Sequence, residues 1–138
     1  MRVLILCTGN SARSQMADGL LRHDGGAAFE VESAGTKPSH VRAEAIAAMR
    51  EIGIDISCHR SKSVDEFAGQ AFDFVITVCD NARESCPVFP AVTQRINWGL
   101  DDPAAVQGSE EVRLAAFRRI RDELRGKLLD FIRRHGTS

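Results

Sequence analysis

The sequence predicts an α/β fold, a three-layer sandwich in which helices cover both faces of a central four-stranded parallel sheet. Short strand-like runs alternate with helical stretches along the chain, which is typical of parallel sheets. Val3 to Leu6 and Phe72 to Val78 are almost wholly apolar, as expected for strands that are buried on both faces. A length of 138 residues suits one core, so we expect a single domain over residues 1–138.

Hydrophobic spacing locates the elements. We expect strands at 3–6, 29–33, 72–78 and 94–98, and helices at 13–23, 41–52 and 109–134. In the last helix apolar residues recur at steps of three and four from Leu114 to Phe131, which gives one buried face. Ligands in such folds bind beyond the carboxyl ends of the strands, so residues that follow strands are the first candidates for a site.

Composition argues against several classes of protein. The formal net charge is −1, so we expect no nucleic-acid partner and no affinity for a membrane surface. No apolar run approaches the ~20 residues that span a bilayer, and the chain opens on a strand rather than on a signal peptide. We therefore expect a cytoplasmic protein, and the mixed composition favours a monomer.

The chain has four cysteines, Cys7, Cys58, Cys79 and Cys86. In a reducing compartment they are expected to be thiols, and reactivity is a better first interpretation than structural disulfides. They lack the paired C-x-x-C spacing of a zinc site, so we expect no metal.

The segment Cys7-Thr8-Gly9-Asn10-Ser11-Ala12-Arg13-Ser14 lies between an expected strand and an expected helix. It predicts a cradle for a tetrahedral oxyanion, because backbone N–H groups and a helix N-terminus attract anions. Arg13 can hold two oxygens in a fork, and Ser14 can donate to the Cys7 sulfur. The same potential favours the thiolate of Cys7, which is the nucleophilic form. The alternative is that Cys7 is only a small apolar residue at the end of a strand.

Transfer chemistry at such a cradle needs a proton donor for the departing oxygen. Asp101-Asp102-Pro103 follows an expected strand and supplies carboxyl groups. Because Asp-Pro is also an ordinary turn signal, an acid role and a turn role both remain open.

Cys79 ends the third expected strand and Cys86 follows seven residues later. They are either packed core thiols or a redox relay with Cys7. In a helix the two would lie about 10.5 Å apart along the axis, whereas a disulfide requires Cα atoms within about 7 Å. A bond between them therefore predicts that any helix here unwinds on oxidation.

These motifs resemble the low-molecular-weight tyrosine phosphatase family and, within it, the thioredoxin-coupled arsenate reductases. The resemblance rests on residues 7–17, 33–35, 54–57, 77–80 with Cys86-Pro87, and 98–104, which follow in order along nearly the whole chain. The phosphatases usually have cysteine and proline where this chain has Ala12 and Gln15. Their acid loop usually carries aromatic residues, whereas this chain has no tyrosine, which suits a small inorganic oxyanion.

The resemblance implies a reaction in which Cys7 attacks arsenate and Asp102, which precedes the proline, protonates the departing oxygen. Cys79 then attacks Cys7, arsenite leaves, and Cys86 attacks Cys79 to free Cys7. Thioredoxin, the external reductant, would reduce the final Cys79–Cys86 disulfide. Phosphate or sulfate would mimic arsenate, and no tightly bound cofactor is implied.

Some members of the family bind potassium at positions that match Asn10, Asp18, Ser33 and Lys62. Lys62 is a cation where the ion needs a carboxylate, so we expect no potassium site, with the Lys62 ammonium in place of the ion. Cys58 matches no family role and is expected to be a bystander. The competing hypotheses are a phosphatase for phosphotyrosine or small phosphoesters, and a non-catalytic oxyanion-binding or redox-sensing module.

Overall fold

The computed structural model describes residues 1–37, 39–67, 69–78 and 93–135. Four strands, β1 (Arg2–Cys7), β2 (Glu30–Gly35), β3 (Phe74–Thr77) and β4 (Gln94–Asn97), form one sheet in the order β2-β1-β3-β4. All three strand pairs are parallel, which confirms the predicted four-stranded parallel sheet. In this register Cys7 lies beside Gly35, so the loops after β1 and β2 open at the same edge.

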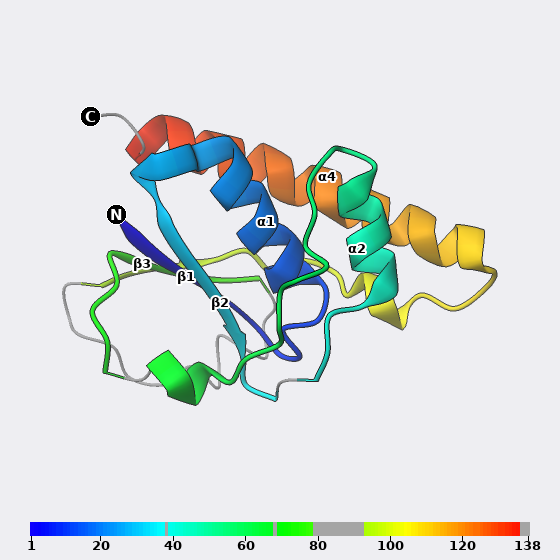
Figure 1. The fold of residues 1–138 in the computed structure, drawn as a ribbon, viewed down its shortest axis with the longest axis horizontal. Coiled ribbons are helices and arrows are strands. Elements are labelled where there is room, and N and C mark those ends of the chain that lie inside the picture. Colours follow the sequence, from blue (N-terminus) through cyan, green and yellow to red (C-terminus); the bar gives the residue numbers. More distant parts are fainter. Residues whose placement is uncertain (38, 68, 79–92, 136–138) are drawn as a thin grey trace.

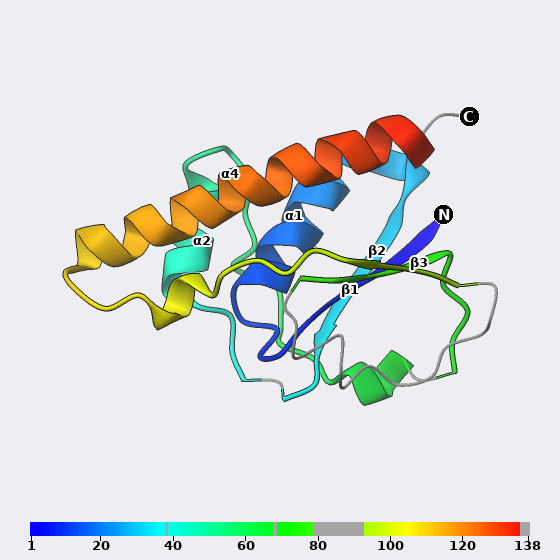
Figure 2. The ribbon, with the colours of Figure 1, turned by 180° about the vertical axis from the view of Figure 1, so that it is seen from behind.

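Three helices, α1 (Arg13–Gly25), α2 (Ala43–Arg50) and α4 (Glu110–His135), lie together on one side of the sheet (Figures 1 and 2). The short 3-10 helix η2 (Val64–Phe67) lies on the opposite side (Figures 1 and 2). Two further 3-10 turns, η1 (Gly26–Ala28) and η3 (Pro103–Ala105), follow α1 and precede α4. From β1 to β3 the described helices and parallel strands alternate as the sequence predicts, and α4 follows β4.

Much of the core lies between the sheet and the helices α1, α2 and α4 on one side of it (Figures 1 and 2). Val3, Leu4, Ile5 and Leu6 of β1 are fully buried, and so are the residues on the inner face of α4. That face includes Phe117, Ile120, Leu124 and Leu128, which have the three- and four-residue spacing expected for it. Burial of these apolar side chains is the main force that holds α4 in place.

Helix α2 is shorter than the predicted 41–52 range. Its end is set by Gly53, which has a φ of +79° and whose N–H donates to the carbonyl of Arg50 at 3.0 Å. Glycine adopts this left-handed conformation without steric cost, which is why it commonly follows a helix end. The start moves to Ala43 because Arg42 is extended.

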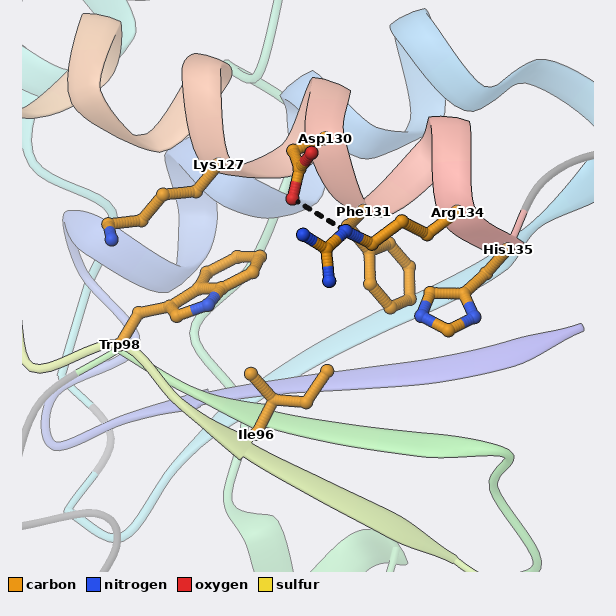
Figure 3. A pocket seen from close by; sticks show the side chains of 7 residues that line it. All are labelled: Ile96, Trp98, Lys127, Asp130, Phe131, Arg134 and His135. Carbon is orange, nitrogen blue, oxygen red and sulfur yellow. Dashed lines mark ion pairs between the residues drawn. The ribbon is translucent and has the colours of Figure 1, made fainter.

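A pocket of about 250 Å³ lies between β4 and the C-terminal part of α4 (Figure 3). Ile96, Trp98 and Phe131 form its apolar wall, and Asp130 pairs with Arg134 at 3.0 Å beside it. Its described lining contains none of the predicted site residues.

In the ranges that the structure describes, no helix has both the length and the apolarity needed to cross a bilayer.

Candidate active site

The loop between β1 and α1 turns its carbonyl oxygens outward. The six consecutive carbonyls from Cys7 to Ala12 each accept a hydrogen bond, at 2.8 to 3.2 Å. The donors are the backbone N–H groups of Thr36, Lys37, Ser39, Arg42 and Met16, the side chain of Gln15 and the hydroxyl of Ser61. Within the described part of the chain, the N–H groups of residues 9–12 donate to no acceptor. The loop therefore offers unpaired backbone donors, as an oxyanion cradle requires.

Asn10 fixes the tightest part of this loop. It is fully buried and has a φ of +47°, a conformation that asparagine tolerates better than most residues. Its Nδ2 donates to the Ser14 hydroxyl at 2.8 Å, and its Oδ1 accepts from the Lys62 N–H at 2.9 Å. Because Ser14 Oγ accepts from Asn10, its own proton is left for another acceptor, which suits the predicted donation to Cys7.

Gly35 allows the loop to lie against the end of β2. A Cβ atom at this position would be 2.5 Å from the Thr8 carbonyl oxygen and 2.8 Å from the Asn10 nitrogen. Both neighbours are backbone atoms and cannot move aside cheaply. The last position of the Ser-Ala-Gly motif at residues 33–35 therefore requires glycine, because any side chain there would collide with the loop.

A pocket of about 180 Å³ opens above the loop. It brings together Cys7, Arg13 and Asp102, which the sequence analysis proposed as a set. The rest of its lining is Thr8, Gly9, Ser11, Ala12, Ser39, Arg42 and Ala104. Cys79 and Cys86 lie outside the described residues. Cys58 is exposed and is not part of this lining.

Arg13 is held at the pocket by the loop that follows β4. Its Nη1 donates to the Leu100 carbonyl at 2.8 Å, and its Nη2 lies 3.8 Å from Asp102 Oδ2. Its Nε is buried without a hydrogen-bond partner among the described residues. A buried donor without a partner is costly, so this edge of the guanidinium is suited to an anion.

The two carboxylate oxygens of Asp102 have different partners: one caps a 3-10 turn, and the other lies towards Arg13. Its Oδ1 accepts from the Ala104 N–H at 2.9 Å and caps η3, whereas Oδ2 faces Arg13. Asp101 instead has a side chain that is 82% exposed, 3.9 Å from Arg119. The turn role of the Asp-Pro sequence is therefore real, and it also places a carboxyl beside the cradle.

Gln15, which stands where the phosphatases usually have proline, is a buried side chain that connects the loop to the segment 59–62. Its Nε2 donates to the backbone and side-chain oxygens of Asn10 and to the Arg60 carbonyl, at 2.9 to 3.1 Å. Its Oε1 lies 3.1 Å from Nδ1 of His59. Since Nε2 is fixed as the donor, Oε1 must accept, and the proton of this contact belongs to His59 Nδ1.

Burial lowers the pKa of His59 below its ordinary value of 6.5. The nearby Arg22 and Lys62 act in the same direction, while Asp18 and Asp55 act against it. The neutral imidazole, with its proton on Nδ1, is therefore the form that accompanies the folded loop.

The residues at the potassium positions of the family have protein partners here. The Asp18 carboxylate accepts from the Ser33 hydroxyl at 2.8 Å and is paired with Arg22. The Lys62 ammonium lies 3.8 Å from Glu32. The cation that neutralises Asp18 is thus Arg22, a residue the sequence analysis did not consider. Among the described residues, no group of three or more His, Cys, Asp or Glu side chains is placed to hold a metal ion.

The family model of the low molecular weight phosphotyrosine protein phosphatases matches residues 2–135. The chain belongs to this family. An arsenate reductase of Halalkalibacterium halodurans is 43% identical over 129 residues, which cover 94% of this chain and 93% of that protein. Within the phosphatase family, this chain is therefore similar to proteins named as reductases.

Solved structures agree with this similarity. An arsenate reductase in the oxidized state has a TM-score of 0.83 and 31% identity, covering 96% of this chain and 97% of that chain. A thioredoxin-dependent arsenate reductase of Corynebacterium glutamicum has a TM-score of 0.75 and 25% identity, and the match covers 96% of this chain and 60% of that one. The phosphatase-family fold is shared by all of them.

Proposed function

We propose that the protein reduces arsenate to arsenite, with Cys7 as the nucleophile and thioredoxin as the external reductant. One observation carries the proposal: a single small pocket is lined by Cys7, Arg13 and Asp102, in a chain that is 43% identical to an arsenate reductase. A pocket of about 180 Å³ is below the ~300 Å³ at which drug-sized ligand sites begin. It suits an inorganic oxyanion.

The geometry of the pocket supports the first step. The N–H groups of residues 9–12 and the free edge of Arg13 hold the oxygens of arsenate, and the Cys7 thiolate attacks arsenic. The bond to one oxygen breaks, and Asp102 supplies the proton with which this oxygen leaves as water. Arsenic remains as As(V), bound to the Cys7 sulfur.

The second step is the reduction. The Cys79 thiolate attacks the Cys7 sulfur, a disulfide forms, and the electron pair of the S–As bond passes to arsenic, which leaves as As(III) in arsenite. Cys86 then attacks Cys79 and releases the Cys7 thiolate, and the dithiol of thioredoxin reduces the Cys79–Cys86 bond. The roles of Cys79 and Cys86 rest on the family resemblance.

Phosphoester hydrolysis is the second candidate function. It is favoured by the match to the phosphatase family model, and because phosphate and arsenate share shape and charge the cradle would hold both. The same Cys7 thiolate would attack phosphorus, and Asp102 would protonate the leaving oxygen. We expect this activity to be minor, since the described part of the pocket lining contains no aromatic side chain to hold a phosphotyrosine ring.

The test is arsenite production with thioredoxin, thioredoxin reductase and NADPH, comparing the wild type with Cys86→Ser and Cys58→Ser. The wild type and Cys58→Ser should turn over repeatedly, whereas Cys86→Ser should form about one arsenite per enzyme and stop. A wild type that makes no arsenite but hydrolyses p-nitrophenyl phosphate would establish the phosphatase instead.

We also propose a cytoplasmic monomer without a resident cofactor. A cytoplasmic location fits the use of thioredoxin, because the relay needs cysteines that are kept reduced between turnovers. Size-exclusion chromatography with light scattering checks the mass, for which the monomer predicts 15.1 kDa.

A further inference from the structure

Arg42 is a second guanidinium that lines the oxyanion pocket. Its Nε is buried and has no hydrogen-bond partner among the described residues. No carboxylate of the described part of the chain pairs with it either. Arg13, the other guanidinium in this lining, is anchored by Leu100 and lies near Asp102. Arg42 is thus a cation at the pocket whose charge the described protein groups do not balance.

The backbone explains why Arg42 is held there. Its N–H donates to the Ser11 carbonyl at 2.9 Å, which ties it directly to the cradle. It is extended, with φ −75° and ψ 142°, at the position that precedes the first residue of α2. Arg42 is therefore fixed at two points, by the loop below and by the helix that follows. Neither point involves the side chain, which remains available for a ligand.

We propose that Arg42 binds the substrate oxyanion as a second guanidinium and makes the pocket selective for inorganic oxyanions over phosphoesters. This inference rests on the proposed function and adds a specificity residue to it. Arg13 holds the anion from the first turn of α1, and Arg42 holds it from the start of α2. Two guanidinium groups match the two negative charges of the arsenate dianion, with hydrogen bonds that are stronger than neutral ones.

Selectivity for inorganic oxyanions follows from the charged guanidinium of Arg42 in the pocket lining. Every oxygen of arsenate, phosphate or sulfate is polar and can accept from a guanidinium. In a phosphoester one oxygen carries an organic group, which cannot accept in the same way and would place apolar atoms against a charged wall. A polar side chain left without its partner is penalised more than a slightly imperfect apolar contact. Arg42 should therefore contribute more to inorganic oxyanions than to aryl phosphates.

The first experiment measures binding without turnover. Phosphate and, separately, sulfate should protect Cys7 from alkylation by iodoacetamide, and mass spectrometry of the Cys7 peptide at increasing anion concentrations would give the dissociation constant. Arg42→Ala should weaken protection about tenfold, the loss expected for one charge-assisted hydrogen bond. Arg42→Lys should recover part of the protection, because lysine restores the positive charge but not the two parallel N–H donors of the guanidinium. The main-chain bond to Ser11 persists in both variants, and Tm checks that they fold.

Arg50→Ala is the matched control. Arg50 lies in the last turn of the same helix, is exposed, and is not in the pocket lining, so this variant removes the same charge from the same element. Wild-type protection in Arg42→Ala would overturn the inference. An equal loss in Arg50→Ala would also overturn it, because the effect would then be one of overall charge.

The second experiment measures selectivity. Arg42→Ala should raise KM for arsenate about tenfold while changing KM for p-nitrophenyl phosphate less than threefold. Equal changes for both substrates would refute the selectivity. If the wild type made no arsenite but its phosphate protection still depended on Arg42, the proposed reduction would fail and the oxyanion role of Arg42 would stand. If arsenite were made and protection did not depend on Arg42, the proposed reduction would stand and the oxyanion role of Arg42 would fail.

Discussion

The Nη1 atom of Arg13 donates to the carbonyl oxygen of Leu100 at 2.8 Å, across 87 residues of sequence. This bond joins the start of α1 to the loop that carries Asp102. It occupies one N–H of Nη1, whereas the buried Nε has no partner among the described residues and remains available to a ligand. The loop between β1 and α1 and the loop that carries Asp102 are thus joined by one side chain.

Arg13→Lys should lower kcat/KM for arsenate about 10²- to 10³-fold, as removal of a preset oxyanion donor does. An ammonium cannot bond Leu100 and grip two oxygens at once. Steady-state kinetics measures this loss. Arg119→Lys is the control, because Arg119 is an exposed residue of α4 outside the pocket lining. Comparable losses in both variants would contradict the assigned role.

Asp102→Asn should lower kcat about 10²- to 10⁴-fold for both arsenate and phosphoester chemistry, since the amide keeps an acceptor but supplies no acid. The bond from the Ala104 N–H can persist, so we expect little change in Tm. Asp101→Asn is the matched control, because that side chain is 82% exposed. If Asp101→Asn were the inactive variant, the acid would have to be reassigned.

Gly35→Ala should destabilise the protein by about 1–3 kcal/mol and displace the oxyanion loop, because the added Cβ would collide with backbone atoms of residues 8–10. Urea unfolding gives the free energy of unfolding. In the exposed helical position Gly126, an added Cβ meets nothing within 4 Å, so Gly126→Ala should instead stabilise by about 0.5–1 kcal/mol. A neutral Gly35→Ala would show that the loop has another way to fit.

Stability should fall as the pH drops below about 6.5, because the pKa of His59 is lowered in the folded state. Between the lowered pKa and the ordinary one, the unfolded chain binds more protons than the folded one. The contribution of His59 is therefore complete above this window and is lost as the pH falls through it. Urea unfolding from pH 7.5 to 5.0 should show the slope, and His59→Gln should flatten it. An unchanged slope in the variant would assign the effect to other groups.

Potassium should leave activity unchanged relative to sodium at the same ionic strength. The reason is that Asp18 already has Ser33 and Arg22 as partners. Arg22→Gln tests this reason, since it removes the resident cation and should create a dependence on potassium if the remaining oxygens can hold the ion. A large potassium effect in the wild type would contradict the prediction.

Much of the fold was predictable because strand positions and helix faces depend on apolar patterning that is local in sequence. The run at 3–6 is buried as expected, and so is the apolar face of α4 from Phe117 to Phe131. Cys7, Arg13 and Asp102 were predictable as a set because each follows or precedes an element whose end lies at the same edge of the sheet.

The remaining parts depend on polar contacts between distant segments, which patterning does not encode. Gln15 bonds His59 and Arg60, more than forty residues away, and neither partner has a motif. Arg42 reads in sequence as the beginning of a helix, and the bond from its N–H to the Ser11 carbonyl, which ties it to the loop, has no sequence signal. Arg22 reads as one exposed residue of an amphipathic helix, although it neutralises the buried Asp18.

The outward carbonyls of the cradle have one further consequence. Because each already has a donor, the peptide dipoles from residue 7 to residue 12 are aligned before any anion arrives. Water would have to reorient around a charge that develops in the reaction. These dipoles do not, because folding has already fixed their orientation, so the reorganisation energy of the reaction is lower. The stability of residues 36–37, 39–42 and 59–62 would in this sense contribute directly to the rate of the proposed reaction at Cys7.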